Sequence, residues 1–589
     1  MMKKMKKIVF ALLGMAFLLV GCSTKEQEPY QNPYRIIVDY LPQTVTISGI
    51  TGTVTPDADY NWITSNGNGS FTVRRNTTGL IRRAEFTISG TSDKAIVNQR
   101  AHGLDAMVSS KLVNKDPDAK TADMQISFST EFDDDYESWG YVFGQSQDRD
   151  ANKDFPQGKF VKGDQTVTLS GVDPELSYYF WAYAQSTEGD KVYSPVFGIA
   201  KPVTVKAGED VQAIYNQAPE FAEVRVEGGV VIDGPFFLRD NVKLSGGWNS
   251  TFDKQDLNNR SVIDGGGKRR ALVSGITETG ERPGFKDACI NGFEIRNGLG
   301  SNVVFNGKLT VEFCFIHHGV NSDKGGGVMA TESEGDELVL ANSIIAWNKA
   351  DAHAGGVSVS GAGTKMTVVN CLFRGNASIA QYGYTAAIHG QSGVQAYVAN
   401  CTFVDNVNWR DGSSATSSPW SAIMFRNKGT HIEFVNNLAA GNWYFLPGVA
   451  DKPDEHPDRY DMPIKPEFIL EQQVQQCDMN VLNSGDYDEN WVFQSNVICG
   501  ADPTNFIGRA GNGDAQKKAQ DACTFVNNAD FKTLFVNYDA GDFHPAGATL
   551  TTGENTTAAK SILGTYMTDL DGNPRITGGK INAGCYQAQ

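Results

Sequence analysis

Paired asparagines recur along the middle of this 589-residue chain and constrain its fold more than any other feature. The members of a pair lie six residues apart, within segments that read alike, such as VVNCLFRGNAS and VANCTFVDNVN. The five pairs are Asn291/Asn297, Asn342/Asn348, Asn370/Asn376, Asn400/Asn406 and Asn436/Asn442. A motif that returns about every 28–36 residues predicts a solenoid, in which each repeat stacks on its neighbours.

A second short strand is expected between the asparagine motifs. Val328, Val357, Ile388 and Ile423 hold equivalent places in runs of small and apolar residues. Coils of this size suit several short strands joined by turns, and stacked coils pair as parallel strands about 4.8 Å apart. Asn tolerates the left-handed backbone of a tight turn, and stacked Asn side chains can bond to the copies above and below.

The position after the first Asn of each motif also recurs. It holds Ser343, Cys371, Cys401 and Asn437, and Cys314 is expected at the same place in an earlier coil. These residue types predict a stack of small, buried, inward-facing side chains. A disulfide between neighbouring coils is the alternative.

The repeats resemble the right-handed parallel β-helix family, the pectate-lyase-like superfamily, over residues 204–589. The stretch VKLSGGWNSTFDKQDLNNRSVIDGGG (242–267) resembles the entry coils of bacterial surface β-helix proteins, and DLDGNPRITGGKINAGCYQ (569–587) is similar to their closing motif. The resemblance implies an all-β chain dominated by a right-handed parallel β-helix. It does not define function, because this fold hosts lyases, hydrolases, adhesins and binding proteins.

Two small β-sandwiches are expected before the coils, at 35–101 and 102–203, because apolar and polar residues alternate there in short runs. The first resembles the BACON domain of Bacteroidetes in NWITSNGNGSFTVRRNTTGLIRRAEFTISGTSDKAIVNQ. The second is similar to fibronectin type III domains in GVDPELSYYFWAYA. The BACON resemblance leaves two roles open, a glycan contact or a spacer.

The N-terminus predicts export and anchoring. Four lysines precede the apolar stretch 8–20, which is too short for a membrane span. It ends in Leu-Val-Gly-Cys22, which resembles a bacterial lipobox. The resemblance implies a signal peptide at 1–21, a lipid on Cys22 that anchors the chain to the outer membrane, and a tether at 22–34. The acidic run KEQE at 25–28 resembles the surface-export signal of Bacteroidetes lipoproteins and implies the cell surface.

The net charge and the cysteine spacing limit the classes of ligand and metal that the chain is expected to bind. The formal net charge is −17, which argues against nucleic acid and weakly against polyanionic glycans, unless calcium or a basic patch intervenes. The cysteines show no CxxC metal spacing. The sequence therefore predicts no metal site and no cofactor, with calcium as the exception if the protein is a lyase.

Candidate catalytic residues are sparse on the face next to the second strand. The outward positions there are Met329, Ser358, His389 and Met424, a set without stacked carboxylates. β-Elimination on a uronic acid needs a base and an acid. The candidates are His389 or Arg426 as the base, with Tyr384 or His353 as the acid.

Aromatic residues in the longer insertions are the candidate ligand-binding residues. Exposed rings beside Arg, Asp and Asn suit sugars, because a ring stacks on the apolar face while polar groups bond the hydroxyls. The alternative is that these rings pack the insertions against the solenoid. The set is Trp409, Arg410, Asp411, Trp420, Trp443 and Tyr444. A short helix is predicted at 466–477, within the insertion that follows Tyr444.

The sequence thus favours a lipid-anchored surface protein whose β-helix binds polysaccharide. A polysaccharide lyase acting on a uronate-containing glycan is the first alternative. An adhesin or structural surface protein is the second.

Overall fold

A computed structural model describes most of the chain, in two compact units. The described residues are 34–76, 82–100, 106–130, 136–187, 189–378, 385–409, 421–427, 429–445, 474–476, 490–499, 517, 521–526, 528–546, 551–552 and 556–587. The first unit contains the residues up to Val172 together with Tyr178–Phe197, and the second contains Asp173–Ser177 and everything from Gly198 onward. Within these ranges no helix is both long and apolar enough to cross a bilayer.

The first unit is built from antiparallel sheets, apart from one parallel edge pair. A four-stranded sheet has the order β1 (Arg35–Val38), β7 (Lys94–Gln99), β6 (Arg82–Ile88), β3 (Val54–Pro56), and a three-stranded sheet has the order β2 (Gln43–Thr46), β5 (Ser70–Val73), β4 (Ile63–Gly67). Phe71 and Phe86 meet in the core at a ring distance of 4.7 Å. Trp62 lies in the same core.

Two further sheets complete the first unit. One has the order β12 (Gly163–Ser170), β9 (Thr121–Ser129), β8 (Met107–Asp116). The other has the order β11 (Lys153–Lys159), β10 (Tyr136–Gly144), β13 (Tyr178–Ser186), β14 (Lys191–Tyr193), with β15 (Phe197–Ile199) joined to β13 and the short helix η2 (Arg149–Ala151) nearby. The alternation in β9 buries Met124, Ile126 and Phe128 on one face, where Phe128 packs on Trp139.

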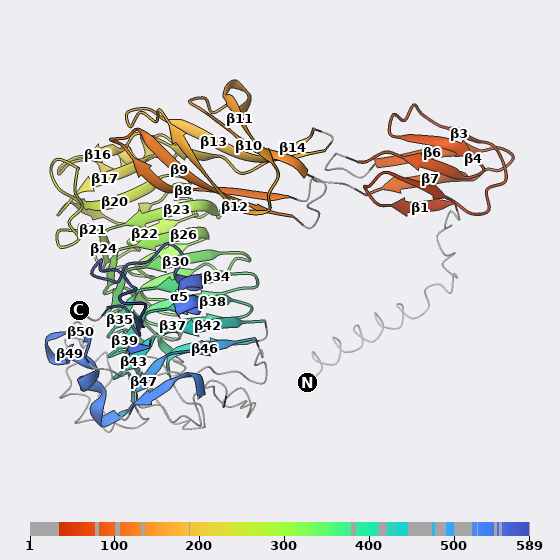
Figure 1. Cartoon of the computed structure of the whole chain (residues 1–589). Coiled ribbons are helices and arrows are strands. Elements are labelled where there is room, and N and C mark those ends of the chain that lie inside the picture. The colour runs from red at the N-terminus through yellow and green to blue at the C-terminus, as the bar shows by residue number, and fades with distance from the viewer. Residues whose placement is uncertain are drawn as a thin grey trace, which may run out of the picture. The chain divides into compact units, whose positions relative to one another are not determined.

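The second unit is a parallel β-helix whose coils stack like rungs (Figure 1). Its first coil sheet contains β16 (Val203–Val205), β17 (Glu223–Glu227), β20 (Lys243–Trp248), β23 (Phe285–Asn291), β26 (Gly307–Glu312), β30 (Glu337–Ala341), β34 (Lys365–Val369), β38 (Gln395–Ala399), β42 (His431–Val435) and β46 (Val492–Gln494). Neighbours in this sheet pair in parallel, one coil apart. The predicted all-β fold with a parallel β-helix is confirmed.

The second coil sheet lies along another side of the same coils. It contains β18 (Val231–Asp233), β21 (Ser261–Asp264), β24 (Phe293–Arg296), β27 (Phe315–His317), β31 (Ile344–Ala346), β35 (Leu372–Arg374), β39 (Thr402–Val404), β43 (Leu438–Ala440), β47 (Val497–Cys499) and β48 (Thr524–Val526).

The third coil sheet is the predicted second strand of each repeat. It contains β19 (Phe236–Phe237), β22 (Leu272–Ser274), β25 (Val303–Phe305), β29 (Val328–Ala330), β33 (Val357–Ser360), β37 (Thr385–Gln391) and β41 (Ser421–Arg426). Val328, Val357, Ile388 and Ile423 are successive partners, so the predicted register is confirmed.

Short strands continue the coils beyond the second sheet: β28 (Val320–Asn321), β32 (Lys349–Ala350), β36 (Ala377–Ser378), β40 (Val407–Trp409), β44 (Trp443–Phe445) and β45 (Val474–Gln476). β45 is a strand that pairs antiparallel with β44, so the helix predicted at 466–477 is wrong for Val474–Gln476. The rest of that segment lies outside the described residues.

A short helix, α2 (Val211–Gln217), closes the first end of the solenoid core. The Asp210 side chain caps it by accepting the Ala213 N–H at 3.0 Å. Tyr215 is fully buried and packs on Phe236 at a ring distance of 5.2 Å. Apolar residues of α2 thus cover what would otherwise be an exposed core at the end of the stack.

The two asparagine columns have different roles. The first Asn of four motifs occupies the left-handed turn, with φ values of 46°, 55°, 55° and 59° at Asn342, Asn370, Asn400 and Asn436. The second Asn of the same motifs forms a buried amide ladder. Its side-chain Nδ2–Oδ1 bonds measure 3.0, 2.9 and 2.9 Å along Asn348, Asn376, Asn406 and Asn442.

The prediction is wrong for the Asn291/Asn297 pair, which is displaced by one position. Asn291 lies in register with Ala341, through Glu312. Asn297 follows Arg296, which pairs through His317 with Ala346, so Asn297 occupies the turn position of Trp347. Glycine occupies the ladder position in the coil that contains Asn297 and in the next coil. Asn302 fills the gap by accepting the Gly298 N–H at 2.7 Å and donating to the Asn348 amide oxygen at 3.0 Å.

The small residues after the first Asn are stacked and buried, as predicted. Cys314, Cys371 and Cys401 are fully buried. The described cysteines are free thiols, so the alternative of a disulfide between coils is wrong for them. The Sγ atoms of Cys371 and Cys401 each lie within 3.5 Å of backbone carbonyls, which partners the thiols without a covalent link.

The C-terminal segment covers the first asparagine column and accepts hydrogen bonds from it. It contains β51 (Thr551–Thr552), α5 (Thr556–Leu563) and β52 (Ile581–Asn582). Asn370 donates to the carbonyls of Tyr566 and Thr568 at 3.0 and 2.9 Å. Asn400 and Asn436 both donate to the Asn582 carbonyl at 2.9 Å. Hydrogen bonds from the asparagine side chains therefore hold the C-terminal segment against coils that lie far from it in the sequence.

Another C-terminal stretch covers the second coil sheet. It contains η6 (Asn528–Leu534), β49 (Phe535–Asn537), η7 (Tyr538–Ala540) and β50 (Asp542–Pro545). Its apolar side chains pack on Leu372, Val404, Leu438 and Val497. The Tyr538 hydroxyl donates to the buried Asp405, whose carboxylate lies 3.6 Å from Arg374 Nε.

The ladder gives the first prediction. Replacing Asn376 with Ala leaves the Asn348 N–H and the Ile345 carbonyl without their buried amide partners, which lie at 3.2 and 2.8 Å. We expect a loss of about 2–4 kcal/mol of stability, measured as a lower melting temperature by calorimetry. The matched control is Asn258→Ala, because the Asn258 side chain is exposed and bonds to no other described residue. Equal melting temperatures for the two variants would contradict a stabilising ladder.

Asp405 gives the second prediction. Burial raises its pKa to about 6, against the bonds from Tyr538 and Arg374 that lower it. The folded state therefore binds this proton more tightly than the unfolded chain. The stabilisation is complete below the unfolded pKa of about 3.9 and is lost as the pH rises through 6, at about 1.4 kcal/mol per pKa unit.

Replacing Asp405 with Asn should remove this part of the pH dependence. We expect the stability of the Asp405→Asn variant to fall less than that of the wild type between pH 4 and 6, measured by thermal unfolding across that range. Glu278→Gln, at an exposed carboxylate, is the control. Parallel curves for the wild type and the Asp405→Asn variant would contradict the assignment.

Candidate functional site

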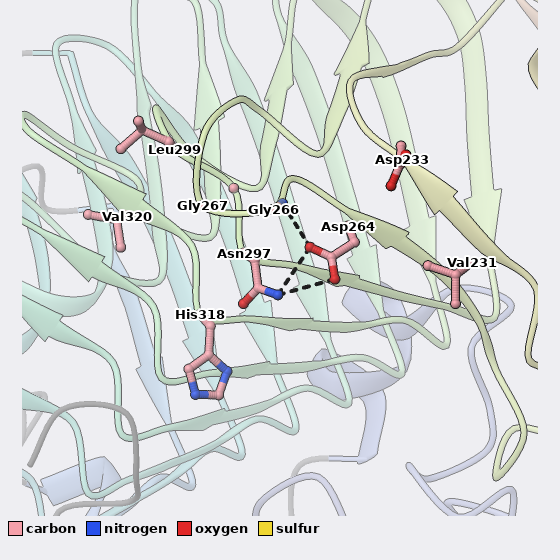
Figure 2. A pocket seen from close by; sticks show the side chains of 10 residues that line it. Val231, Asp233, Asp264, Gly266, Gly267, Asn297, Leu299, His318 and Val320 are labelled. Carbon is pink, nitrogen blue, oxygen red and sulfur yellow. Dashed lines mark hydrogen bonds between the residues drawn. The ribbon is translucent and has the colours of Figure 1, made fainter. Parts of the chain in front are cut away.

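A groove of about 680 Å³ crosses four successive strands of the second coil sheet (Figure 2). It lies on the coils before Ile344, whereas the C-terminal layer packs on the coils from Ile344 onward. The steps between four neighbouring strands sum to about 14 Å. The lining residues are Val231, Asp233, Asp264, Gly266, Gly267, Asn297, Gly298, Leu299, His318 and Val320.

A repeated tetrapeptide creates the acidic side of the groove. Val-Ile-Asp-Gly occurs at 231–234 and again at 262–265. The two copies pair in register, so Asp233 is the direct partner of Asp264. Ile263 is fully buried, and strand alternation turns the flanking residues outward. Sequence reasoning missed this carboxylate pair because it searched the third coil sheet, although the repeated VIDG was a visible signal.

The two carboxylates differ in their bonding. Asp264 accepts bonds from Arg296 Nε at 2.8 Å, from the Gly266 N–H at 2.8 Å and from Asn297 Nδ2 at 3.1 and 3.2 Å. Burial alone would raise the pKa of Asp264, but these donors hold it below its usual 3.8. Asp233 is exposed, and its carboxylate forms no hydrogen bond or ion pair with another described residue. Figure 2 shows Asp233 apart from the bonded Asp264 and Asn297.

A carboxylate–histidine chain adjoins the groove. Glu294 Oε1 lies 3.1 Å from His317 Nε2 and 2.6 Å from Arg296 Nη1. The His317 Nδ1 lies 2.5 Å from the Nδ1 of His318, which lines the groove. The bond with His317, followed by that of Arg296, lowers the pKa of Glu294 to about 2 against the opposing effect of burial. Burial lowers the pKa of His317 below 6.5, although Glu294 acts in the opposite direction.

Aromatic rings hold this chain in place. Phe315 stacks on His317 at a ring distance of 4.2 Å, and Trp347 lies 5.4 Å from the His318 ring. His317 and His318 belong to one coil and Trp347 to the next, because His317 pairs with Ala346 in the second coil sheet. The rings are therefore positioned by the coil register, and they limit the rotation of both imidazoles.

Of the four predicted catalytic residues, the structure describes two side chains, and they are in contact. The His353 and His389 rings stack at 4.5 Å. His389 is fully buried, with its Nδ1 3.4 Å from the Ser358 hydroxyl. The strand register aligns Met329, Ser358, His389 and Met424 in one column, as predicted, but Ser358, His389 and Met424 are buried, so the column is not an exposed face.

The other sequence candidates fall outside what the structure describes. The side chain of Arg426 is not among the described ones, and neither are those of Trp409, Trp443 and Tyr444. Cys22, Tyr384, Arg410, Asp411 and Trp420 lie entirely outside the described residues. Their roles in catalysis, ligand binding and lipid attachment stay predictions.

The described side chains include no group of three or more His, Cys, Asp or Glu placed to hold a metal ion. The residues that line the groove present hydrogen-bonding groups and exposed aliphatic surface. Val231 and Leu299 are 58% and 49% exposed. Such a surface can bind a ligand that has both hydroxyl groups and apolar faces.

Comparisons with known proteins add little to this site. No protein-family model matches the chain, and no curated protein does. Among solved structures, pectate lyase PelI from Erwinia chrysanthemi in complex with tetragalacturonic acid is 10% identical, with a TM-score of 0.15 over 58% of this chain and 90% of that one. Pectate lyase Pel3 from Pectobacterium carotovorum is 11% identical, with a TM-score of 0.14 over 58% of this chain and 90% of that one. At these values the likeness supports no inference about activity, and the fold assignment rests on the strand register.

The carboxylate–histidine chain gives the third prediction. Replacing Glu294 with Gln removes the charge that raises the pKa of His317, whereas the burial that lowers it remains. We expect the pKa of His317 to fall further below 6.5, measured by NMR titration of the imidazole protons. Glu278→Gln should leave it unchanged. An unchanged or higher pKa in the Glu294→Gln variant would show that Glu294 does not act on His317.

Proposed function

We propose that this chain is a lipid-anchored surface protein that binds polysaccharide in the groove of the second coil sheet. The observation that carries the proposal is an open groove across four coils that combines carboxylate, amide and imidazole side chains with exposed aliphatic ones. Sugars present the same combination, because their ring faces are apolar and their edges carry hydroxyls.

The shape of the groove supports a chain-like ligand. Its length of about 14 Å, from the strand spacing, exceeds one sugar ring and suits a short stretch of an oligosaccharide. Gly266 and Gly267 adopt φ values of 62° and 66° in the turn beside Asp264. A Cβ at either position would meet no atom within 4 Å, so the space beside this turn is open.

The aliphatic residues supply contact area without a deep cavity. Val231 and Leu299 are exposed on different coils of the groove, where each can contact the apolar face of a sugar ring. The polar residues then orient the ligand. Asn297 Nδ2 donates to Asp264, which fixes the orientation of the Asn297 side-chain amide toward a ligand.

The lipid anchor in this proposal rests on the sequence around Cys22, which resembles a lipobox. Anchoring would keep the groove at the cell surface, where polysaccharide is met. Labelling cells with a radioactive fatty acid and comparing the wild type with Cys22→Ser tests the anchor separately from binding. Equal labelling of both proteins would contradict it.

The fourth prediction tests the groove itself. Full-length protein is first screened on a polysaccharide array, and the best ligand is then titrated by calorimetry. Replacing both Val231 and Leu299 with Ala should weaken binding about five- to tenfold, because apolar contact area is lost. The matched control is Val536→Ala, at a residue that is 59% exposed and outside the groove.

Each outcome of this experiment has a defined meaning. Binding that the double variant loses and the control keeps supports the groove. No binding of any polysaccharide contradicts the proposal, and binding that is equal in all three proteins places it elsewhere. An unsaturated product absorbing in the ultraviolet, formed from a uronate-containing glycan, would instead identify a lyase.

A further inference from the structure

We infer that His544, Asp542 and Asp571 form a clamp that joins two C-terminal segments and loosens as the pH rises toward alkaline values. One segment is the C-terminal layer, from η6 to β50, which covers the second coil sheet. The other is the closing segment, 566–587, which accepts hydrogen bonds from the first asparagine column. The clamp is independent of polysaccharide binding.

The His544 ring lies between two carboxylates. Its Nδ1 is 2.6 Å from Asp542 Oδ1, and its Nε2 is 2.7 Å from Asp571 Oδ2. A neutral imidazole carries one N–H, so it can donate to only one of these oxygens and turns a lone pair toward the other. Both contacts are hydrogen bonds only when the ring is an imidazolium. The positions of the two aspartates therefore favour the charged form of His544.

Local contacts hold both aspartates and the ring in place. Asp542 also accepts the backbone N–H of His544 at 3.1 Å. Asp571 lies in a turn of the closing segment, where the fully buried Asp569 accepts the Asp571 N–H at 3.1 Å. The Tyr586 ring packs on the imidazole at a ring distance of 4.4 Å, and burial raises the pKa of the Tyr586 hydroxyl, which stays neutral. A cation beside an aromatic ring is favourable, so Tyr586 also favours the imidazolium.

The two aspartates are the charged residues that act on His544 within the described structure. The Arg374 guanidinium lies 4.8 Å from the centre of the Phe543 ring. Phe543 and His544 are neighbours in β50, so they point to opposite faces of the strand, and only Phe543 is buried. Lys532 and Asp539 of the same layer pair with each other at 2.7 Å. The charge balance of the clamp is therefore set by one imidazole and two carboxylates.

The pH range of the clamp follows from these groups. Partial burial acts to lower the pKa of His544, but the bonds to Asp542 and Asp571 outweigh it and hold this pKa above its usual 6.5. The clamp is therefore complete below about pH 6.5 and is lost as the pH rises through the raised pKa. The bond from His544 holds the pKa of Asp542 below its usual 3.8. At the acid end the clamp is therefore lost only as the pH falls through this lowered pKa.

The clamp affects how often the layer opens locally. Apolar side chains of the layer pack on Leu372, Val404 and Leu438, and these contacts do not depend on pH. The side chains of Asp542 and Asp571 are 41% and 44% exposed, so each ion pair contributes little stability. Loss of the clamp therefore raises the population of the open layer without releasing it. Each opening exposes apolar side chains on the sheet that carries the groove.

Hydrogen–deuterium exchange of the full-length protein tests the clamp. Protection factors of the backbone amides in 534–545 are compared at pH 6.5 and 8.5, with the amides of β34 as the internal reference. We expect about two- to fivefold less protection of the layer at pH 8.5, the range for exposed ion pairs, and no change in the reference. Asp405 lies beneath the same layer, but its pKa of about 6 is below this pH range. Added salt should reduce the difference.

Variants identify the residues responsible. His544→Gln stays neutral, so at pH 6.5 it should show the protection that the wild type shows at pH 8.5, with no change between the two. Asp571→Asn should remove most of the pH dependence and lower the pKa of His544, measured by NMR titration of the imidazole protons. The matched control is His431→Gln, because His431 lies 3.6 Å from Glu433 on the first coil sheet. This control should keep the wild-type difference.

Loss of the pH difference in both clamp variants, with its retention in the control, supports the clamp. Equal protection of the wild-type layer at the two pH values overturns it. A difference that persists in the clamp variants overturns it as well, because another group would then be titrating. If His544→Gln does not fold, Asp571→Asn decides alone, since it keeps the histidine and removes one carboxylate charge.

Discussion

The buried amide ladder is the interaction on which the rest of this β-helix depends. Asn348, Asn376 and Asn406 each donate to the next side chain, and these three and Asn442 also donate to a carbonyl of the preceding coil. These groups lie away from water, so a slip of one residue would leave several of them unpaired, at about 1–3 kcal/mol each. The ladder therefore fixes the register between coils. The same register aligns the side chains that face outward from successive coils.

Two C-terminal segments cover different parts of the outer surface of the coils. One stretch bonds to the first asparagine column through the carbonyls of Tyr566, Thr568 and Asn582. Another covers the second coil sheet around Leu372 and Leu438. Most outward residues under this cover are apolar, with Arg374 and Thr402 as exceptions, whereas the earlier coils carry Glu294 and Asp264 in the same columns. The polar groove thus occupies the part of the sheet that precedes the covered part.

Sequence patterns predicted the fold better than the site. The Asn pairs and the Val328–Ile423 column reflect a backbone requirement that repeats in every coil, so they are visible without a structure. The substitution of Asn302 for a missing rung could not be predicted, because it depends on a side chain reaching from another turn. The hydrogen bond from Asn400 to the Asn582 carbonyl could not be predicted either, since the two residues are 182 positions apart. The Asp233–Asp264 pair could be predicted from the repeated VIDG, which places an aspartate at the same position of two neighbouring coils.

Hydrogen–deuterium exchange with and without a bound glycan tests the central claim most directly, because it reports where on the coils a ligand lies. The account predicts slower exchange at 231–234, 264–267 and 297–299 when the ligand is present. It also predicts unchanged exchange in the coils around Leu372 and Leu438, beneath the C-terminal layer. Protection confined to the third coil sheet around His353 and His389, with none in the groove, would contradict it.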